Sequence, residues 1–597
     1  MDFFLVQSLT GLAGAASLFL VAAGLTVIFG VTRVVNFSHG SLYMLGAYIG
    51  WSILTRLPRD PAWFAAGCLL AALATGGLGM LLEVTLLRRL YRAPELLQLL
   101  ATFGVVLIVQ DLMPLLWGPN DLPLPRPPWL RAFVTILGQR FPRYDLVLIA
   151  LGPLVLGLLW LLLRRARFGM LVRAATEDRD MVAALGIDQK LLFTAVFTLG
   201  SALAGLGGAL ALPNQSANLQ MDLGVIVEAF VVVVVGGLGS IPGAFLASLL
   251  IGELQAFGLV LLPRASLVLM FAAMAVVLVL RPNGLLGEPL SPVAGAAGRP
   301  TLIRLPWRWG GWAGGAAVAL LAVAPLVLGP YPVTVLTEAL IAMLFATSLH
   351  LMMGPGAMPS FGHAAWFGLG AYGAALASKA VAMPLALLAG LGLAAMAAAV
   401  FGWFVVRLSG VYLAMLTLAF AQIVWAAAVQ WSGLTGGDDG ILGVWPGPGF
   451  YWVVLCCTAG GVWLLLRAMH APFGFALRAA RDSTRRAEAI GLNPERLRFA
   501  AFALAGAAAG LSGALFAFAK GSVFPGSFGI ERSVDALLMV LMGGVQTIIG
   551  PVFGALAYTG LYDGLLQVTS LWRLSLGSII LLIVLVFPSG IAGRRSA

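Results

Sequence analysis

Several residue types that carry chemistry are scarce in this chain of 597 residues. Charged residues make up only 10%, and the sequence holds four histidines, three cysteines and three lysines. The cysteines, Cys68, Cys456 and Cys457, all lie inside apolar runs, so we expect neither a disulfide framework nor a redox pair. The histidines lack the spacing of metal ligands. We therefore expect no metal site and no cofactor.

A nucleotide-binding motif is also missing. None of the lysines (Lys190, Lys379 and Lys520) lies in a Gly-x-x-x-x-Gly-Lys-Ser/Thr phosphate loop. No nucleophile, base and orienting group occur together outside the apolar runs, which argues against an enzyme. If the chain does work that needs ATP, a partner must hydrolyse it.

Apolar residues dominate instead. They make up 61% of the chain, and the mean hydropathy is +1.00. Runs of about 20 apolar residues recur, each long enough to cross a bilayer core of about 30 Å as a helix. The sequence therefore predicts an all-α fold, a polytopic transmembrane helical bundle embedded in membrane lipid. The first run has no basic residues before it, so we expect it to be retained as a span rather than cleaved as a signal peptide.

Hydropathy predicts about 16 to 19 segments. The first half contains segments near 4–30, 36–55, 62–87, 95–117, 145–163, 190–212, 224–240 and 242–281, the last broken at Pro263. The second half contains segments near 309–329, 333–353, 360–378, 383–406, 411–431, 451–467, 497–519, 531–546, 548–567 and 571–588. The stretch 288–308 has no apolar run and is predicted to be a cytoplasmic linker between two membrane domains, 1–287 and 309–597.

The net charge of +11 comes from arginines in short loops between apolar runs. This pattern is typical of positive-inside topology and not of a nucleic-acid surface, so we expect no nucleic acid partner. The loop 118–143 is an exception, because it carries four arginines but must lie outside if the spans are right. Five prolines between positions 119 and 128 predict a rigid, non-helical segment.

The chain is predicted to be a tandem duplication. Segment 36–48 has a second copy at 360–372, with six of thirteen residues identical, and both 363 − 39 and 372 − 48 give 324. Basic loops match between the halves, so the two repeats should be parallel and related by a pseudo-twofold axis along the membrane normal. Both copies interrupt an apolar run with small and polar residues, which points to a transport path.

Polar residues inside the spans are candidates for that path. In the duplicated segment these are Asn36, His39, Ser360 and His363, where a histidine either faces a cavity or bonds a neighbouring helix. Two carboxylates, Glu228 and Asp535, each stand eight residues before a Gly-Gly pair. They could contact a substrate ammonium group, although a structural role such as pairing with an arginine is the preferred interpretation.

A second duplicated segment, 168–187 and 473–492, is too charged to be a span. Its apolar residues, among them Val182, Leu185, Ala487 and Ile490, recur at helical spacing and predict a single amphipathic cytoplasmic helix in each half. Charged residues lie four apart on one face of each helix, and a glycine follows where each helix should end in a left-handed residue. The residues concerned are Arg173, Glu177 and Gly186 in the first copy and Arg478, Asp482 and Gly491 in the second.

At this point the sequence resembles the permease subunits of branched-chain amino acid ABC importers. The first half is similar to the H-type permease and the second half to the M-type permease, joined end to end. Segments 236–243, 434–440 and 543–551 also resemble family sequences, apart from Gln546, which stands where the first half has Gly239. Close backbone packing is expected at the glycine but not at the glutamine.

The resemblance implies a function and a set of partners. The duplicated cytoplasmic helices would be coupling helices that seat in two ATPase subunits, and an external binding protein would deliver the substrate. The substrate would be a branched-chain or related hydrophobic amino acid, and the chain would lie in a bacterial cytoplasmic (inner) membrane. Two alternatives stay open, namely an ABC permease for urea or short amides and a proton-coupled secondary carrier for amino acids.

Overall fold

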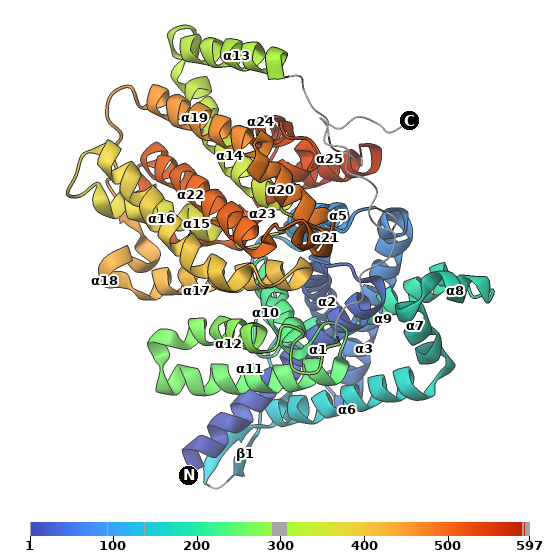
Figure 1. Cartoon of the computed structure of the whole chain (residues 1–597). Helices are drawn as coiled ribbons and strands as arrows, with labels where there is room; N and C mark the ends of the chain where they lie inside the picture. Colours follow the sequence, from blue (N-terminus) through green and yellow to red (C-terminus); the bar gives the residue numbers. More distant parts are fainter. Residues whose placement is uncertain (1, 92, 137, 289–306, 588–589, 591–597) are drawn as a thin grey trace. The chain divides into compact units, whose positions relative to one another are not determined.

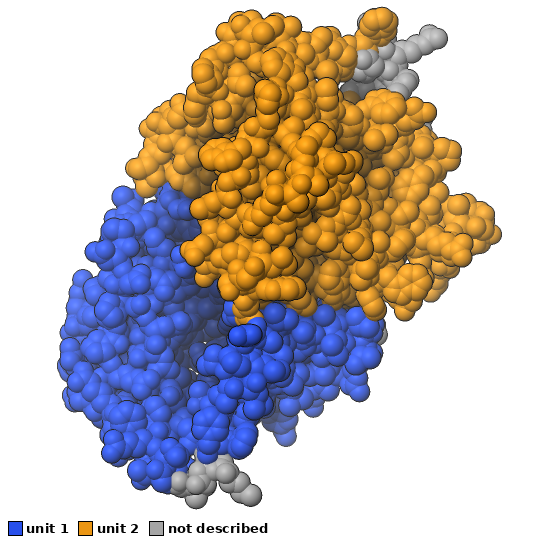
Figure 2. Space-filling model, turned by 90° about the vertical axis from the view of Figure 1, so that its left-hand side faces the viewer, with its two compact units in different colours: residues 1–292, 573–581 blue, residues 293–572, 582–597 orange. Residues whose placement is uncertain are grey.

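The computed structural model describes residues 2–91, 93–136, 138–288, 307–587 and 590. Its described residues are almost entirely helical (Figure 1). All but the ends of the predicted linker 288–308 lies outside the described residues. The chain divides into two compact units: unit 1 comprises 1–292 and 573–581, and unit 2 comprises 293–572 and 582–597 (Figure 2).

Unit 1 contains the first twelve helices and a small hairpin. The helices are α1 (Asp2–Thr32), α2 (Ser38–Leu54), α3 (Pro61–Leu82), α4 (Arg88–Leu90), α5 (Glu95–Trp117), α6 (Arg143–Arg165), α7 (Arg167–Glu177), α8 (Arg179–Ala184), α9 (Gln189–Ala211), α10 (Met221–Gly236), α11 (Ile241–Leu261) and α12 (Ser266–Leu280). A π-helical turn (Glu83–Leu87) joins α3 to α4, and 3₁₀ turns occur at Pro128–Leu130 and Pro263–Ala265.

Unit 2 contains most of the remaining elements. The helices are α13 (Trp307–Val327), α14 (Pro330–Met353), α15 (Ala364–Ala377), α16 (Met383–Val405), α17 (Gly410–Gln430), α18 (Ser432–Thr435), α19 (Phe450–His470), α20 (Pro472–Asp482), α21 (Thr484–Ala489), α22 (Pro494–Lys520), α23 (Ile530–Gly543), α24 (Gly550–Val568) and α25 (Trp572–Val586). Short strands β3 (Ile441–Leu442) and β4 (Ser522–Val523) pair antiparallel, and 3₁₀ turns occur at Gly437–Asp439 and Pro525–Phe528.

Every predicted apolar segment coincides with a helix, and the predicted break at Pro263 is confirmed by the turn between α11 and α12. Not every one of these helices is long enough to cross a membrane, however. Among the described residues, twelve helices are long and apolar enough to span a membrane by length and composition. Helices α10 and α23, with 16 and 14 residues, end at Gly-Gly pairs and reach only about 24 and 21 Å, short of the bilayer core.

The pairs end these helices because their second glycine adopts a left-handed backbone. Gly237 has φ +103° and Gly544 has φ +105°, a region that glycine enters without a steric penalty. Each short helix then packs against the next one, α10 against α11 and α23 against α24. The turns that follow the two Gly-Gly pairs differ at the matched residues Gly239 and Gln546. Gly239 has a left-handed φ of +83°, whereas Gln546 does not have a positive φ.

Small residues allow close helix crossings in both units. Helix α9 packs against α1, α2 and α3, and α22 packs against α14, α15 and α16. A Cβ atom at Gly46 would overlap the backbone of Gly205, and one at Gly370 would overlap Gly510. Large apolar side chains such as Leu73 and Trp403 are exposed, as expected for helices that face lipid.

The loop 118–143 is not simply rigid and irregular, because it contains an antiparallel hairpin that sequence reasoning missed. Strand β1 (Phe133–Ile136) pairs with β2 (Gln139–Pro142) in the register Phe133↔Pro142 to Ile136↔Gln139. An isolated antiparallel bridge also joins Leu122 to Ala217, with N···O distances of 2.9 and 3.1 Å. The loop is thus fixed to the segment between α9 and α10.

A buried charge cluster holds the π-helical turn. The Glu83 side chain is fully buried, and its Oε2 lies 3.1 Å from Arg88 Nη2. Thr194 on α9 donates to the same oxygen at 2.6 Å and accepts from Arg88 at 2.6 Å. The carboxylate is therefore fully paired inside unit 1.

Candidate functional site

The two copies of the duplicated segment adopt the same local structure. In each, the chain leaves a long helix and enters a short one, α2 or α15. The N–H of Phe37 donates to Thr102 Oγ1 at 3.3 Å, and the N–H of Phe361 donates to Thr417 Oγ1 at 3.2 Å. The first partner is on α5 and the second on α17. Sequence reasoning missed these threonines, although their matched position in the two halves was a usable signal.

The four predicted path residues of these segments are fully buried, and each has one polar side-chain atom without a hydrogen-bond partner among the described residues. The atoms are Asn36 Nδ2, His39 Nδ1, Ser360 Oγ and His363 Nδ1. The second polar side-chain atom of Asn36 and of each histidine is hydrogen-bonded within its own unit. Asn36 Oδ1 accepts from the N–H and hydroxyl of Ser38 at 3.0 and 2.6 Å, and so caps the start of α2.

The two histidines bond to the preceding long helix. His39 Nε2 lies 3.0 Å from the carbonyl oxygen of Val21 on α1, and His363 Nε2 lies 2.8 Å from Ser348 Oγ on α14. The His363 ring also stacks on Phe345 at 5.3 Å between centroids. In this conformation both histidines join helices, and their predicted role in lining a path stays a prediction.

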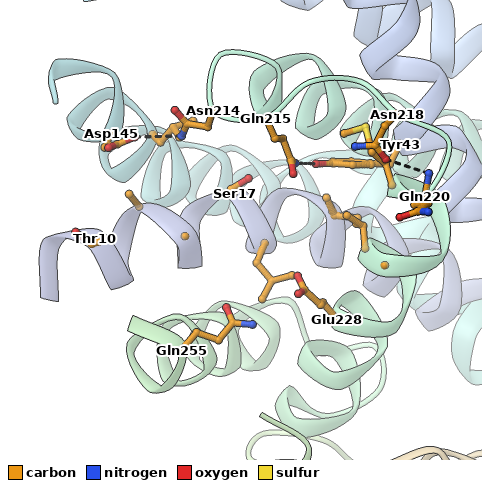
Figure 3. Close-up of a pocket in the computed structure, with 18 residues that line it drawn as sticks. Thr10, Ser17, Tyr43, Asp145, Asn214, Gln215, Asn218, Gln220, Glu228 and Gln255 are labelled. Atoms are coloured by element: carbon orange, nitrogen blue, oxygen red, sulfur yellow. Dashed lines mark hydrogen bonds between the residues drawn. The ribbon is translucent and has the colours of Figure 1, made fainter. Parts of the chain in front are cut away.

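The two matched carboxylates have different surroundings. Asp535 accepts a hydrogen bond from Tyr558 at 2.6 Å and lies 3.8 Å from Arg532 on its own helix. Glu228 forms none of the ion pairs found among the described residues. It lies on the wall of a cavity of about 570 Å³ in unit 1 (Figure 3).

The cavity lies where the loop between α9 and α10 meets the ends of helices in unit 1. Gln215 Nε2 donates a hydrogen bond to the hydroxyl of Tyr43 on α2 at 3.0 Å (Figure 3). Arg126 from the loop 118–143 donates to Asn214 Oδ1 at 2.7 Å, and Asn214 donates to Asp145 Oδ1 at 3.2 Å. These hydrogen bonds hold the rim of the cavity in place, so Arg126 has a structural role.

The duplicated cytoplasmic segments are each two helices, so the prediction of one helix over 168–187 and one over 473–492 is wrong. Helix α7 ends before Asp178 and α20 before Ser483, and both residues have extended backbones. The side chain of each caps the next helix, since Asp178 accepts from the N–H of Met181 at 3.0 Å and Ser483 from that of Arg486 at 3.3 Å. Asp and Ser at matched positions were the missed signal.

The predicted helix ends are confirmed. Gly186 has φ +81° and Gly491 has φ +85°, the left-handed conformation expected for a terminating glycine. The apolar stripe is confirmed only in part. Val182 and Ala487 are buried, but Leu185 is 72% exposed and Ile490 is 73% exposed. These two side chains form an exposed apolar tip beside each glycine, which sequence reasoning had assigned to the inward face.

The predicted charged residues do not pair four apart along their helices. Arg173 donates to the carbonyl oxygen of Leu163 at the end of α6. Arg478 donates to Met469 at 2.9 Å at the end of α19, and Asp482 pairs with Arg481 at 2.8 Å. The matched arginines therefore satisfy terminal carbonyls of the preceding span. Glu177 is exposed.

The cytoplasmic helices also contact the chain just before the duplicated segments. In unit 1, Arg33 Nη2 donates to the carbonyl oxygen of Thr176 at 3.4 Å. In unit 2, Arg481 Nη1 donates to that of Gly354 at 2.9 Å. Arg33 and Ala357, at matched positions, have φ +57° and +49°, and non-glycine residues in this region are strained.

Among the described residues, no group of three or more His, Cys, Asp and Glu side chains is placed to hold a metal ion. The geometry of the described residues is therefore that of buried polar helix junctions, a polar cavity in unit 1 and an exposed apolar tip in each unit.

Comparisons with known proteins agree with this architecture. The family model described as "Branched-chain amino acid transport system / permease component" matches the chain twice, over residues 8–280 and 331–588. The permease protein LivH of a high-affinity branched-chain amino acid transport system from Salmonella typhimurium is 28% identical over 298 residues, covering 48% of this chain and 96% of the relative. The corresponding protein BraD of Pseudomonas aeruginosa is 29% identical over 297 residues, with the same coverage.

A second type of relative also matches. The permease protein LivM of the Escherichia coli high-affinity branched-chain amino acid transport system is 26% identical over 316 residues, covering 46% of this chain and 73% of the relative. Relatives of the LivH and LivM types thus each span about half of the chain, which combines two permease proteins in one polypeptide. Since the family model matches most of its length, the chain belongs to the family of permease components of branched-chain amino acid transport systems.

Proposed function

We propose that this chain forms both membrane domains of an ABC importer for branched-chain or related hydrophobic amino acids in the cytoplasmic (inner) membrane of a bacterium. Two separate ATPase subunits drive it, and an external binding protein supplies the substrate. Relatives that are permease proteins of branched-chain amino acid transport systems support the substrate class. The absence of a phosphate loop in the sequence fits a permease that relies on its partners for ATP hydrolysis.

The two halves are parallel repeats, with residues 1–287 as the H-type domain, 288–308 as a cytoplasmic linker and 309–597 as the M-type domain. The close crossings at Gly46 and Gly370 and the threonine contacts of Phe37 and Phe361 occur at matched positions, which supports a common ancestry. Fusion fixes the halves at equal numbers, so one chain suffices for one transporter.

One observation carries the proposal: each unit ends its cytoplasmic helices in the same exposed apolar tip. Leu185 and Ile490 are matched in sequence, are both almost three-quarters exposed and both precede a left-handed glycine. A single exposed apolar side chain is ordinary on a protein surface, but its repetition at matched positions in both halves suits a docking contact. Two copies of one surface suit two ATPase subunits of similar structure.

A physical route leads from each tip to the predicted path. The strained residue Arg33 bonds directly to α7, and Arg481 on α20 bonds to Gly354, three residues before the strained Ala357. The buried residues Asn36, His39, Ser360 and His363 follow directly, and their unpaired polar atoms would be satisfied by water in an open conformation. Movement of a tip would therefore change the packing where the path is expected.

The test is transport by the purified chain in proteoliposomes, together with the ATPase subunits and binding protein of its own organism. We expect ATP-dependent uptake of leucine, isoleucine or valine, and none when ATP is absent. Uptake of urea or acetamide, with no uptake of amino acids, would contradict the substrate class. Uptake driven by a proton gradient without ATPase subunits would contradict the importer mechanism and support a secondary carrier. Mass measurement should give one copy of this chain with two ATPase subunits.

A further inference from the structure

The cavity in unit 1 carries negative charge without a matching positive side chain. Its volume of about 570 Å³ falls within the range of small-molecule sites. Two carboxylates, Asp145 and Glu228, line it, and neither Lys, Arg nor His is among the lining residues. Five amide side chains complete the polar part of the wall: Asn214, Gln215, Asn218, Gln220 and Gln255. A ligand with a positive charge and hydrogen-bonding groups would complement this wall.

Among the described residues Glu228 has no partner of opposite charge, and its side-chain hydrogen bond is with the neutral amide of Gln255. Asp145 already accepts a hydrogen bond from Asn214, which Arg126 holds in turn. Glu228 lies on the apolar helix α10, is half-buried and opens onto the cavity opposite the α1 residues Thr10 and Ser17 (Figure 3). A carboxylate in such a helix is costly unless a cation or a set of donors reaches it.

The corresponding positions of unit 2 are neutralised internally. Lys520, matched in sequence to Gln215, pairs with Glu338 at 2.5 Å. Asp535, matched to Glu228, is bonded by Tyr558 and lies near Arg532. The two halves have therefore diverged here, and the carboxylate left open is in unit 1.

The rest of the wall suits an aliphatic group. Leu18 and Val21 on α1, Leu148 on α6 and Val225 on α10 line the cavity beside the polar residues. A solute with an ammonium group and a branched aliphatic side chain would match both kinds of wall. Inorganic cations would use the carboxylate but not the apolar surface.

We propose that this cavity is a subsite of the permease that receives the ammonium group of the solute at Glu228, with its aliphatic part against α1 and α6. The proposal rests on the proposed function, because it takes an amino acid as the solute. Under the proposed orientation the cavity lies at the external end of unit 1, where solute arrives. The loop contacts at Asn214 and Ala217 keep the subsite preformed.

Two glycines allow the cavity to be filled without disturbing the fold. A Cβ atom at Gly14 or Gly224 would meet nothing within 4 Å, and both residues line the cavity. Gly157 on α6 is equally unobstructed but does not line it. Gly14→Phe therefore blocks the proposed subsite, Gly157→Phe is its matched control, and Glu228→Gln removes the charge while keeping the shape.

The experiment measures binding of radiolabelled leucine to the full chain in nanodiscs, without the binding protein. Two competitors test which group of leucine is recognised. Leucinamide keeps the ammonium group and lacks the carboxylate, whereas 4-methylpentanoate keeps the carboxylate and lacks the ammonium group. We expect leucinamide and not 4-methylpentanoate to compete, and sodium or potassium at equal concentration to leave binding unchanged. Glu228→Gln should weaken binding at least about 10-fold, the usual scale for loss of one partner of a buried charge pair.

Gly14→Phe should abolish binding, and Gly157→Phe should leave it unchanged, with thermal unfolding of each variant as the control for folding. Equal competition by 4-methylpentanoate, competition by simple cations, or unchanged binding in both Glu228→Gln and Gly14→Phe would overturn the proposal. Wild-type protein that binds no ammonium compound at millimolar concentration would also overturn it. ATP-driven uptake by wild-type proteoliposomes is scored separately. Leucine uptake that is unaffected by the cavity variants would leave the proposed function intact and refute the subsite alone.

Discussion

The exposed tips give the sharpest prediction for the contact with the ATPase subunits. Replacing Leu185 by alanine removes three carbon groups, each worth about 0.8 kcal/mol when buried. Because the side chain is 72% exposed in the free permease, docking can bury most of it. The expected loss is then about 1.7 kcal/mol, or about 20-fold in affinity. The same substitution at Ile490, which is 73% exposed, should cost a similar amount.

The two tips are far apart in sequence and contact separate ATPase subunits in the proposed complex, so their effects should be nearly additive. The double variant Leu185→Ala, Ile490→Ala should lose about 300-fold in the combined affinity for the pair of ATPase subunits, measured with the permease in nanodiscs. Its thermal unfolding should match wild type, because exposed residues contribute little to folding. The pair Leu185→Met, Ile490→Met keeps the apolar area and serves as the control. An affinity of the double alanine variant within threefold of wild type would refute the docking assignment.

Three further changes test other parts of the account. Arg481→Ala removes the link from α20 to the end of α14, so uptake per ATP hydrolysed should fall severalfold while ATPase binding is unchanged; equal coupling would exclude this route. Gly46→Val would overlap the backbone of α9, and we expect a loss of folded protein in size-exclusion chromatography, whereas a normal elution profile would contradict the close crossing. Arg88→Met leaves the buried carboxylate of Glu83 without its cation, and should lower the free energy of unfolding by about 3–5 kcal/mol; Glu83→Gln in the same protein should restore part of that loss.

The helical architecture was predictable because apolar runs of membrane length leave the backbone no other way to satisfy its hydrogen bonds. All predicted segments coincide with helices, and the terminating glycines Gly186 and Gly491 follow from their need for a left-handed backbone. The number of crossings could not be determined from hydropathy, because hydropathy measures composition. It does not register that the Gly-Gly pairs at 236–237 and 543–544 end two helices that are shorter than the bilayer core.

Side-chain orientation was the part that the sequence could not supply. Helical spacing placed Leu185 with Val182 on one stripe, but α8 ends at Ala184, so Leu185 lies outside the helix and its side chain does not follow the helical spacing. Arg173 was predicted to lie on one helical face with Glu177, yet its guanidinium donates to a carbonyl group at the end of α6. Such competition between partners depends on three-dimensional distance, which sequence separation does not encode.

The difference between Glu228 and Asp535 illustrates the same limit. Both stand at matched positions before a Gly-Gly pair, and the sequence favoured a structural role for each. The structure pairs Asp535 with Tyr558 and Arg532, in line with that role, whereas Glu228 opens onto a cavity. Tyr558 lies on α24, and Arg532 lies one turn before Asp535 on α23. No local sequence pattern distinguishes the paired carboxylate of Asp535 from that of Glu228.

The central claim is that both halves insert in the same direction and present their tips to the same compartment. It can be tested by placing a single cysteine at position 185 or 490 in a chain whose three native cysteines, Cys68, Cys456 and Cys457, are replaced by serine. A membrane-impermeant maleimide is then applied to vesicles of either orientation. We expect both positions to react in inside-out vesicles and neither in right-side-out vesicles. Labelling of 185 and 490 from opposite faces of the membrane would contradict the parallel repeat and the shared ATPase surface together.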